Sequence, residues 1–312
     1  MSAHLAQVVG HELPDKRVSW NKRDLLVYAV SVGAEAADYQ VVYELDDKFT
    51  ALPTYPVVLP FKLDDQDVNL FADSMRGLSR VPGLPKLDPT RVVHATQSIE
   101  ILKDLPLVSG SGWRWKSRYT GVAENKSGII LTTESLLVDP KGTPHAKLYA
   151  SGFYLGAKAM GEKFSKSIAG PPQAKPIPKD KAPTHVVKDQ TTPEQAILFR
   201  LNGDYNPLHI DPKIGAAAGF GGVILHGLCT FGFSARAVIK AFSGDDPKLL
   251  KFFGARFTAP VKPGDALEVQ IWEVGPGPKG TTEVTFVTKN LNTGKIVLGG
   301  GIAYVVKPSA KL

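Results

Sequence analysis

The sequence predicts an α+β fold in which helices come before antiparallel strands. In the second half of the chain, a long apolar stretch with helical spacing precedes several segments that alternate between apolar and polar residues. The first half repeats this order more weakly. Between the two, residues 161–183 are dense in Pro and Lys, which is typical of an extended, solvated connector.

Residues 1–160 form the first predicted unit. A helix is expected at 22–32 with Asn21 as its N-cap, and an apolar segment broken by prolines follows at 49–61. Strands are expected at 92–102, 112–122, 129–138 and 147–155. We interpret this unit as a degenerate duplicate of the second.

Residues 184–312 form the second predicted unit, and a helix opens it. Thr192 suits the N-cap, Pro193 suits the first helical position, and Gln195 stands where a capping box has Glu or Gln. This helix is expected to end near 202–203, where a polar turn segment begins.

The apolar stretch 228–242 predicts a second helix in this unit. It should be buried on most sides, because its only charged residues are Arg236 and Lys240. Strands are expected after it at 267–273, 284–289 and 296–306, with a turn at 290–294. A sheet that curls around the helix would bury both elements.

The composition excludes several classes of protein. The 312 residues are 43% hydrophobic and 21% charged, as in ordinary globular proteins. No apolar run is long enough to span a membrane, and the first residues lack the apolar core of a secretion signal. The single cysteine, Cys229, can form no internal disulfide, which fits a reducing compartment; a small core residue is the simpler interpretation than a catalytic thiol.

The net charge of +7 at pH 7 has two interpretations. It describes either a solvated basic surface or one that attracts a polyanion, such as the phosphates of CoA or of nucleic acid. The sequence has no Cys/His spacing of the zinc type and no aromatic RNA-binding motif. Nucleic acid is therefore the weaker option.

Candidate catalytic groups lie in the segment FRLNGDYNPLH, which ends at His209. Asp204 precedes this histidine across an Asn-Pro turn, so both side chains can face one cavity. A carboxylate and an imidazole placed in this way could hold a water molecule and move its protons. The alternative is a structural turn in which Asp204 caps a backbone N–H and His209 packs at the surface, and for the isolated motif this is the simpler explanation.

Gly227 follows His226 at the expected start of the buried helix. Free N–H groups at a helix start attract developing negative charge, and a glycine lets a thioester carbonyl approach the backbone. Such a site could stabilise the enolate oxygen that forms when water adds to an enoyl thioester. Alternatively, Gly227 permits tight helix packing. His226 is either a second catalytic group or, as the simpler interpretation, a cap or core histidine.

The motifs NGDYNPLH at 202–209 and ILHGLCTFG at 224–232 resemble the signature of the MaoC-like (R)-specific enoyl-CoA hydratases, also called hydratase 2. The likeness is densest at 193–257 and covers most of the chain. It is greatest to the hydratase part of the peroxisomal multifunctional β-oxidation enzyme. The resemblance implies a double hot-dog fold, in which two curved antiparallel sheets each wrap a helix. It also implies that the first half, which lacks the motif, accommodates the acyl chain.

The resemblance implies roles for individual residues. It makes Asp204 and His209 the catalytic pair, Asn206 the residue that orients the water, and Gly227 the oxyanion-hole residue. The implied reaction is reversible hydration of trans-2-enoyl-CoA to (3R)-3-hydroxyacyl-CoA in fatty-acid β-oxidation. Neither a metal nor another cofactor is expected, because the thioester itself acidifies the α-carbon.

Three further residues are expected beside the acyl-CoA substrate: Gly203, His226 and Arg256. Arg256 lies where relatives carry a basic residue, and its planar fork suits phosphate, although an ordinary surface arginine is an equal alternative. Asn202 and Gly215 depart from the small residue and the Ala or Ser usual in the family. Neither departure removes a reacting group, but both bear on how the turn packs and thereby on rate and chain-length preference.

The last three residues, Ala310, Lys311 and Leu312, resemble the Ser-Lys-Leu address of peroxisomal proteins. We therefore expect a peroxisomal location and an import receptor as a partner. A homodimer is expected from the family, and the dehydrogenase fused to some relatives is not expected because no glycine-rich nucleotide motif follows a strand. The alternatives are a dehydratase of a specialised acyl or polyketide thioester and a non-catalytic acyl-CoA-binding protein.

Overall fold

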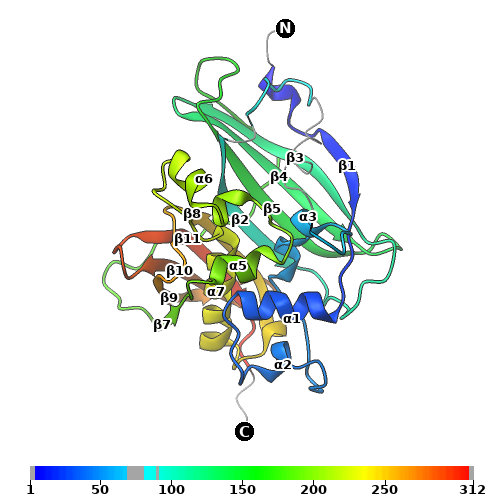
Figure 1. Cartoon of the computed structure of the whole chain (residues 1–312), viewed down its shortest axis with the longest axis vertical. Helices are drawn as coiled ribbons and strands as arrows, with labels where there is room; N and C mark the ends of the chain where they lie inside the picture. The colour runs from blue at the N-terminus through cyan, green and yellow to red at the C-terminus, as the bar shows by residue number, and fades with distance from the viewer. Residues whose placement is uncertain (1–3, 69–80, 89–90, 309–312) are drawn as a thin grey trace.

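The computed structural model describes residues 4–68, 81–88 and 91–308. Its strands form one 11-stranded sheet in the order β1-β3-β4-β5-β2-β8-β11-β10-β9-β7, with β6 beside β3. The sheet curves around helices that lie against it (Figure 1). This arrangement confirms the predicted α+β class. The expected import signal at 310–312 lies outside the described residues.

The C-terminal half of the sheet surrounds one long helix, α7 (Gly227–Phe242), as predicted. Its apolar side chains are buried, and Phe231 packs edge-on against Phe253 of the sheet at 4.7 Å between ring centroids. The strands of this half are β7 (His185–Gln190), β8 (Leu250–Phe257), β9 (Ala266–Pro276), β10 (Thr282–Asn290) and β11 (Ile296–Val305). The sequence predicted β9 to β11 but not β8, whose central residues are buried on both faces and therefore do not alternate.

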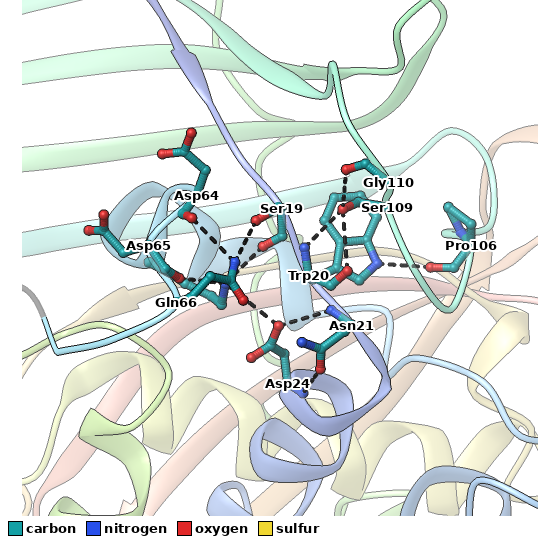
Figure 2. Close-up of polar contacts among 11 residues, drawn as sticks. Ser19, Trp20, Asn21, Asp24, Asp64, Asp65, Gln66, Pro106, Ser109 and Gly110 are labelled. Atoms are coloured by element: carbon teal, nitrogen blue, oxygen red, sulfur yellow. Dashed lines mark hydrogen bonds and ion pairs between the residues drawn. The ribbon is translucent and has the colours of Figure 1, made fainter.

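The N-terminal half contains the four strands expected there and two short ones that were not predicted. These strands are β1 (Glu12–Arg17), β2 (Val92–Ile101), β3 (Arg114–Asn125), β4 (Gly128–Val138), β5 (Pro144–Leu155) and β6 (Phe164–Ser167). Helix α1 (Lys22–Ser31) begins as predicted at Asn21. The Asp24 N–H donates to Asn21 Oδ1 at 3.3 Å, and the Asn21 N–H donates to the Asp24 carboxylate at 2.9 Å (Figure 2).

Helix α1 does not occupy the place that α7 has in the other half. It packs beside α5 (Gln195–Arg200) and α2 (Tyr39–Val42) (Figure 1). Its C-terminal end also touches α7, since a Cβ on Gly232 would lie 2.4 Å from Val32. The proline-broken segment forms two short helices, η2 (Tyr55–Val57) and α3 (Leu59–Lys62), that fill the core instead.

Helix α5 begins later than predicted. Its N-cap is Glu194, and Thr192 makes no side-chain cap. Only one bond of the expected capping box is present, in which the Thr192 N–H donates to Gln195 Oε1 at 3.2 Å. The Gln195 amide is directed elsewhere: it donates to the Ser31 carbonyl of α1 at 2.8 Å, so tertiary packing overrides the local cap.

The connector at 161–183 is extended, and it is also anchored to the sheet. Thr285 Oγ1 donates to the Lys175 carbonyl at 3.1 Å, and Trp272 Nε1 donates to the Lys181 carbonyl at 2.9 Å. Both anchors lie on the face opposite α7, because Thr285 alternates with Phe286, which stacks on Phe253 inside. The chain therefore passes between the halves along the outside of the sheet.

The two halves meet edge to edge. Strands β2 and β8 pair antiparallel, with Ser98 opposite Gly254 and Ile99 opposite Phe253. A single apolar core extends across this seam. The other helices of the described residues are η1 (Leu5–Gln7), η4 (Pro207–His209), α6 (Pro212–Ala217), η5 (Pro247–Leu249) and η6 (Pro278–Gly280). Within the described ranges, every helix is too short or too polar to cross a membrane.

Candidate active site

The candidate catalytic turn connects α5 to α6, and its own side chains shape it. Gly203, with φ +107°, follows the end of α5, and Asn206 is extended (φ −55°, ψ 119°) because it precedes Pro207. The Asn206 Oδ1 accepts the Leu208 N–H at 3.0 Å, so it caps η4. Asp204 Oδ1 accepts the Asn206 N–H at 3.3 Å. These bonds turn the Asp204 and His209 side chains toward the same place.

A cavity of about 490 Å³ lies at this place. The C-terminal half lines it with Asp204, Asn206, His209, His226 and Gly227. The N-terminal half lines it with β2, β4 and β5 residues, among them Val93, His94, Thr133, Ala150 and Gly152. The structure thus brings together five of the seven predicted site residues, in a cavity that both halves build.

Asp204 and His209 are both buried, and burial brings their pKa values closer together. Burial raises the pKa of the Asp204 carboxyl, while the nearby His209 opposes this shift. Burial lowers the pKa of the His209 imidazole, and Asp204 opposes that shift in turn. The proton affinities of the two groups are therefore closer than in water, which makes proton exchange between them and a bound water less costly.

The orientation of His209 follows from one hydrogen bond. Its Nδ1 lies 2.9 Å from the Ile224 carbonyl oxygen. Because a carbonyl only accepts, Nδ1 carries the proton and donates. In the neutral ring, Nε2 then has the lone pair and can take a proton from a water molecule in the cavity.

Gly227 opens α7, where the first N–H groups have no acceptor within the helix. A Cβ at this position would lie 3.0 Å from the Phe257 ring, tighter than most real contacts. The glycine thus allows close packing, and it also leaves the helix start open toward the cavity that it lines. Both interpretations drawn from the sequence are compatible with this geometry.

The other two predicted substrate-contact residues lie differently. Gly203 has φ +107°, and a Cβ on it would lie 2.5 Å from Lys62 Cα, so it permits the catalytic turn to pack against α3. Arg256 is exposed on β8. It alternates with Phe257, which lines the cavity, so its side chain leaves the opposite face of the sheet. Contact between Arg256 and a CoA phosphate remains a prediction.

Lys62, the last residue of α3, anchors the segment against which the candidate catalytic turn packs. Its Nζ donates to the Ser19 carbonyl at 2.9 Å and to the Asp65 carbonyl at 3.0 Å, and it lies 3.6 Å from the Asp24 carboxylate. Figure 2 shows Ser19, Asp24 and Asp65 close to one another. Trp20 beside them donates from Nε1 to the Pro106 carbonyl at 2.8 Å. The N-terminal half therefore supports the catalytic turn from outside the cavity.

Asp204, His209 and His226 have potential metal-ligand atoms within 4.8 Å of one another. The two imidazole rings stack, with centroids 3.7 Å apart and an interplanar angle of 29°. Lone pairs in nearly parallel ring planes do not converge on one ion. The Nδ1 of His209 and the Nε2 of His226 also face carbonyl oxygens. This arrangement suits acid–base chemistry better than metal binding.

His94 is a cavity residue that the sequence analysis missed. It lies on β2 next to a register irregularity, with its ring 4.7 Å from that of Phe257. Burial lowers its pKa to about 4, so it is neutral at pH 7. Its Nε2 is buried without a hydrogen-bond partner among the described residues. A single histidine in an expected strand gives no sequence signal, because only the fold brings it to the cavity.

Both halves of the chain match known protein families. Residues 18–156 match the MFE-2 hydratase 2 N-terminal domain, and residues 175–295 match the MaoC like domain. The chain is 32% identical to a "Probable enoyl-CoA hydratase 2" of Dictyostelium discoideum, over 100% of this chain and 99% of that protein. It is 35% identical to the "Peroxisomal multifunctional enzyme type 2" of Drosophila melanogaster, over 97% of this chain and 48% of that protein.

A solved structure from the same family has a similar fold. The MaoC-like dehydratase from Phytophthora Capsici superposes with a TM-score of 0.84 at 33% identity, over 98% of this chain and 100% of that chain. The double hot-dog fold that the sequence predicts is thereby confirmed.

Proposed function

The chain belongs to the MaoC-like enoyl-CoA hydratase 2 family, and from this membership we propose that it hydrates trans-2-enoyl-CoA reversibly to (3R)-3-hydroxyacyl-CoA. The observation that carries the proposal is the meeting of Asp204 and His209 at a cavity that continues into the other half of the sheet. A buried acid–base pair serves the reacting carbons, and the extension offers room for an acyl chain.

In the proposed reaction, Asp204 and His209 hold one water molecule, and the amide of Asn206 orients it. The water oxygen forms a bond to C3 while the pair takes up one of the water protons. The C2–C3 double bond is lost, and C2 receives a proton from the pair. The pair thus ends with the protons that it held at the start. The charge that develops on the thioester oxygen is placed at the start of α7, beside Gly227.

A coupled assay tests this proposal. The purified protein is given trans-2-decenoyl-CoA together with one of two dehydrogenases, each specific for one enantiomer of 3-hydroxyacyl-CoA. We expect oxidation of the product by the (3R)-specific enzyme alone. Product oxidised only by the (3S)-specific enzyme would refute the assignment. Tight binding of the thioester without turnover would favour the non-catalytic alternative.

We also propose that the protein acts in peroxisomal β-oxidation. Relatives whose names include the word peroxisomal support this location, and so does the likeness of Ala310, Lys311 and Leu312 to a peroxisomal address. Removal of the three residues should leave the purified activity unchanged and send a tagged protein to the cytosol. Peroxisomal staining that persists after truncation would argue against this signal.

A homodimer is the proposed assembly. Val30 on α1 and Ile197 and Leu201 on the neighbouring α5 are apolar and about half exposed, and such surface residues are common where subunits meet. Light scattering coupled to gel filtration would measure the mass. A mass near that of one 33.6 kDa chain would contradict the proposal.

A further inference from the structure

His226 is buried at the N-cap position of α7, directly before Gly227. Its side chain makes no capping hydrogen bond to the helix, so the cap does not explain the histidine. The ring instead lies between two others. It stacks on the His209 ring with 3.7 Å between ring centroids, and it lies tilted against the Phe199 ring with 5.0 Å between centroids.

One edge of the His226 ring is also fixed. Its Nε2 lies 3.1 Å from the Asp204 carbonyl oxygen. Because this carbonyl only accepts, Nε2 carries the proton and donates to it. The other nitrogen, Nδ1, is then a lone-pair atom, buried without a hydrogen-bond partner in the described part of the chain. Burial lowers the pKa of His226 well below its usual value, and His209 lowers it further, so the ring stays neutral.

Each member of the catalytic pair is therefore in contact with the same ring. His209 is held at its edge by the Ile224 carbonyl and at its face by His226. Asp204 is held through its backbone by the hydrogen bond from His226. Through this one ring, the position of Asp204 depends on that of His209.

We infer that His226 is a positioning residue that sets the geometry of Asp204 relative to His209 and joins both to the start of α7. This role rests on the proposed hydration reaction. It differs from the substrate-contact role expected from the sequence, because a residue that binds substrate acts on KM and a residue that positions the pair acts on kcat.

Two variants separate the two contacts. His226→Phe keeps an aromatic ring against His209 but loses the donor to Asp204. His226→Asn loses both the ring and this bond, because its amide nitrogen lies where Nδ1 of the imidazole is and does not reach the Asp204 carbonyl. For each variant we expect kcat with trans-2-decenoyl-CoA to fall by about 10²-fold, the scale of a misplacement of about 1 Å, with KM changed less than about twofold. His185→Asn, the same change at an exposed histidine of β7, should leave both constants unchanged.

A spectroscopic measurement does not depend on activity. The ¹⁵N side-chain spectrum of His209 should show a single Nδ1–H tautomer in the wild type, and this signal should shift or average in His226→Asn. A rise in KM with unchanged kcat in both variants would overturn the inference, as would an unchanged His209 spectrum. If His226→Asn fails to fold, the kcat of the nearly isosteric His226→Phe decides. A wild type that hydrates no enoyl-CoA would defeat the proposed function, while the spectra would still test the contacts.

Discussion

The two halves of the sheet hold their helices in different ways. In the C-terminal half, α7 has 16 residues and fills the concave side of the sheet. In the N-terminal half, α1 has 10 residues and packs beside α5 instead. Small side chains on β4 and β5, such as Thr133 and Ala150, therefore face the cavity where a longer helix would otherwise pack.

The two halves therefore contribute differently to the candidate site. The half with the longer helix carries the candidate catalytic turn, which packs beside the start of α7. The half with the shortened helix contributes volume and the support behind Gly203 and Lys62. Two copies of one architecture can thus diverge when a helix is lost from one of them.

The largest expected effect tests whether the chemistry belongs to the C-terminal half. Asp204→Asn and His209→Ala should each lower the hydration rate by about 10²-fold or more, the usual contribution of a general acid or base. His145→Ala in the N-terminal half, where the imidazole lies 3.6 Å from Asp139, should keep the wild-type rate. Wild-type activity in a folded Asp204 or His209 variant would show that the pair is not catalytic.

The pH dependence should locate the same pair. Burial raises the pKa of Asp204 above its ordinary 3.8 and lowers that of His209 below its ordinary 6.5. The pair accepts a proton from water only while it has not already gained one. We therefore expect kcat/KM to be constant near neutral pH and to fall on the acid side, in the pH window below the ordinary imidazole pKa of 6.5, because burial lowers the pKa of His209. A midpoint above this window would point to a different titrating group.

A larger side chain in the N-terminal half should change chain-length preference. Ala150→Phe would fill part of the cavity, and overpacking of this kind costs about 1–3 kcal/mol. Activity toward trans-2-decenoyl-CoA should drop about tenfold, whereas activity toward crotonyl-CoA should stay within about twofold. Ala150→Ser serves as the conservative control. An equal loss for both substrates would mean that the acyl chain does not reach this part of the cavity.

The smallest expected effect concerns Arg256 at the seam between the halves. An exposed charge pair contributes about 0.2–1 kcal/mol, so Arg256→Ala should raise KM for an enoyl-CoA by at most about fivefold. The KM of the matching enoyl-pantetheine, which lacks the nucleotide phosphates, should not change. Equal changes for the two thioesters would assign Arg256 another role.

Local patterns in the sequence account for much of the fold and the site. The helical spacing before Phe242 predicted α7, and the turn at Asn206 and Pro207 placed Asp204 beside His209. Both depend on residues close together in the chain. The family resemblance supplied the hot-dog fold, and it strengthened the expectation for Gly227 that the helix start had already raised.

The features that the sequence did not predict depend on contacts between distant parts of the chain. Strand β8 is covered on both faces, so its sequence shows no alternation. His94 and Thr133 reach the cavity only because β2 and β4 share a sheet with the other half. The start of α5 differs because Gln195 bonds to Ser31 of α1 rather than only to its own helix. Such long-range contacts leave no periodic signal.

The pairing of β2 with β8 also has a consequence for biosynthesis. During translation, β2 leaves the ribosome long before β8, and until β8 arrives its outer edge exposes unpaired N–H and C=O groups. The partially made chain therefore carries an edge that can recruit other chains, and closure of the seam must wait for contacts between distant parts of the sequence. Such contacts slow folding. Productive folding of this protein is thus a competition between completing the second half and aggregating through the first.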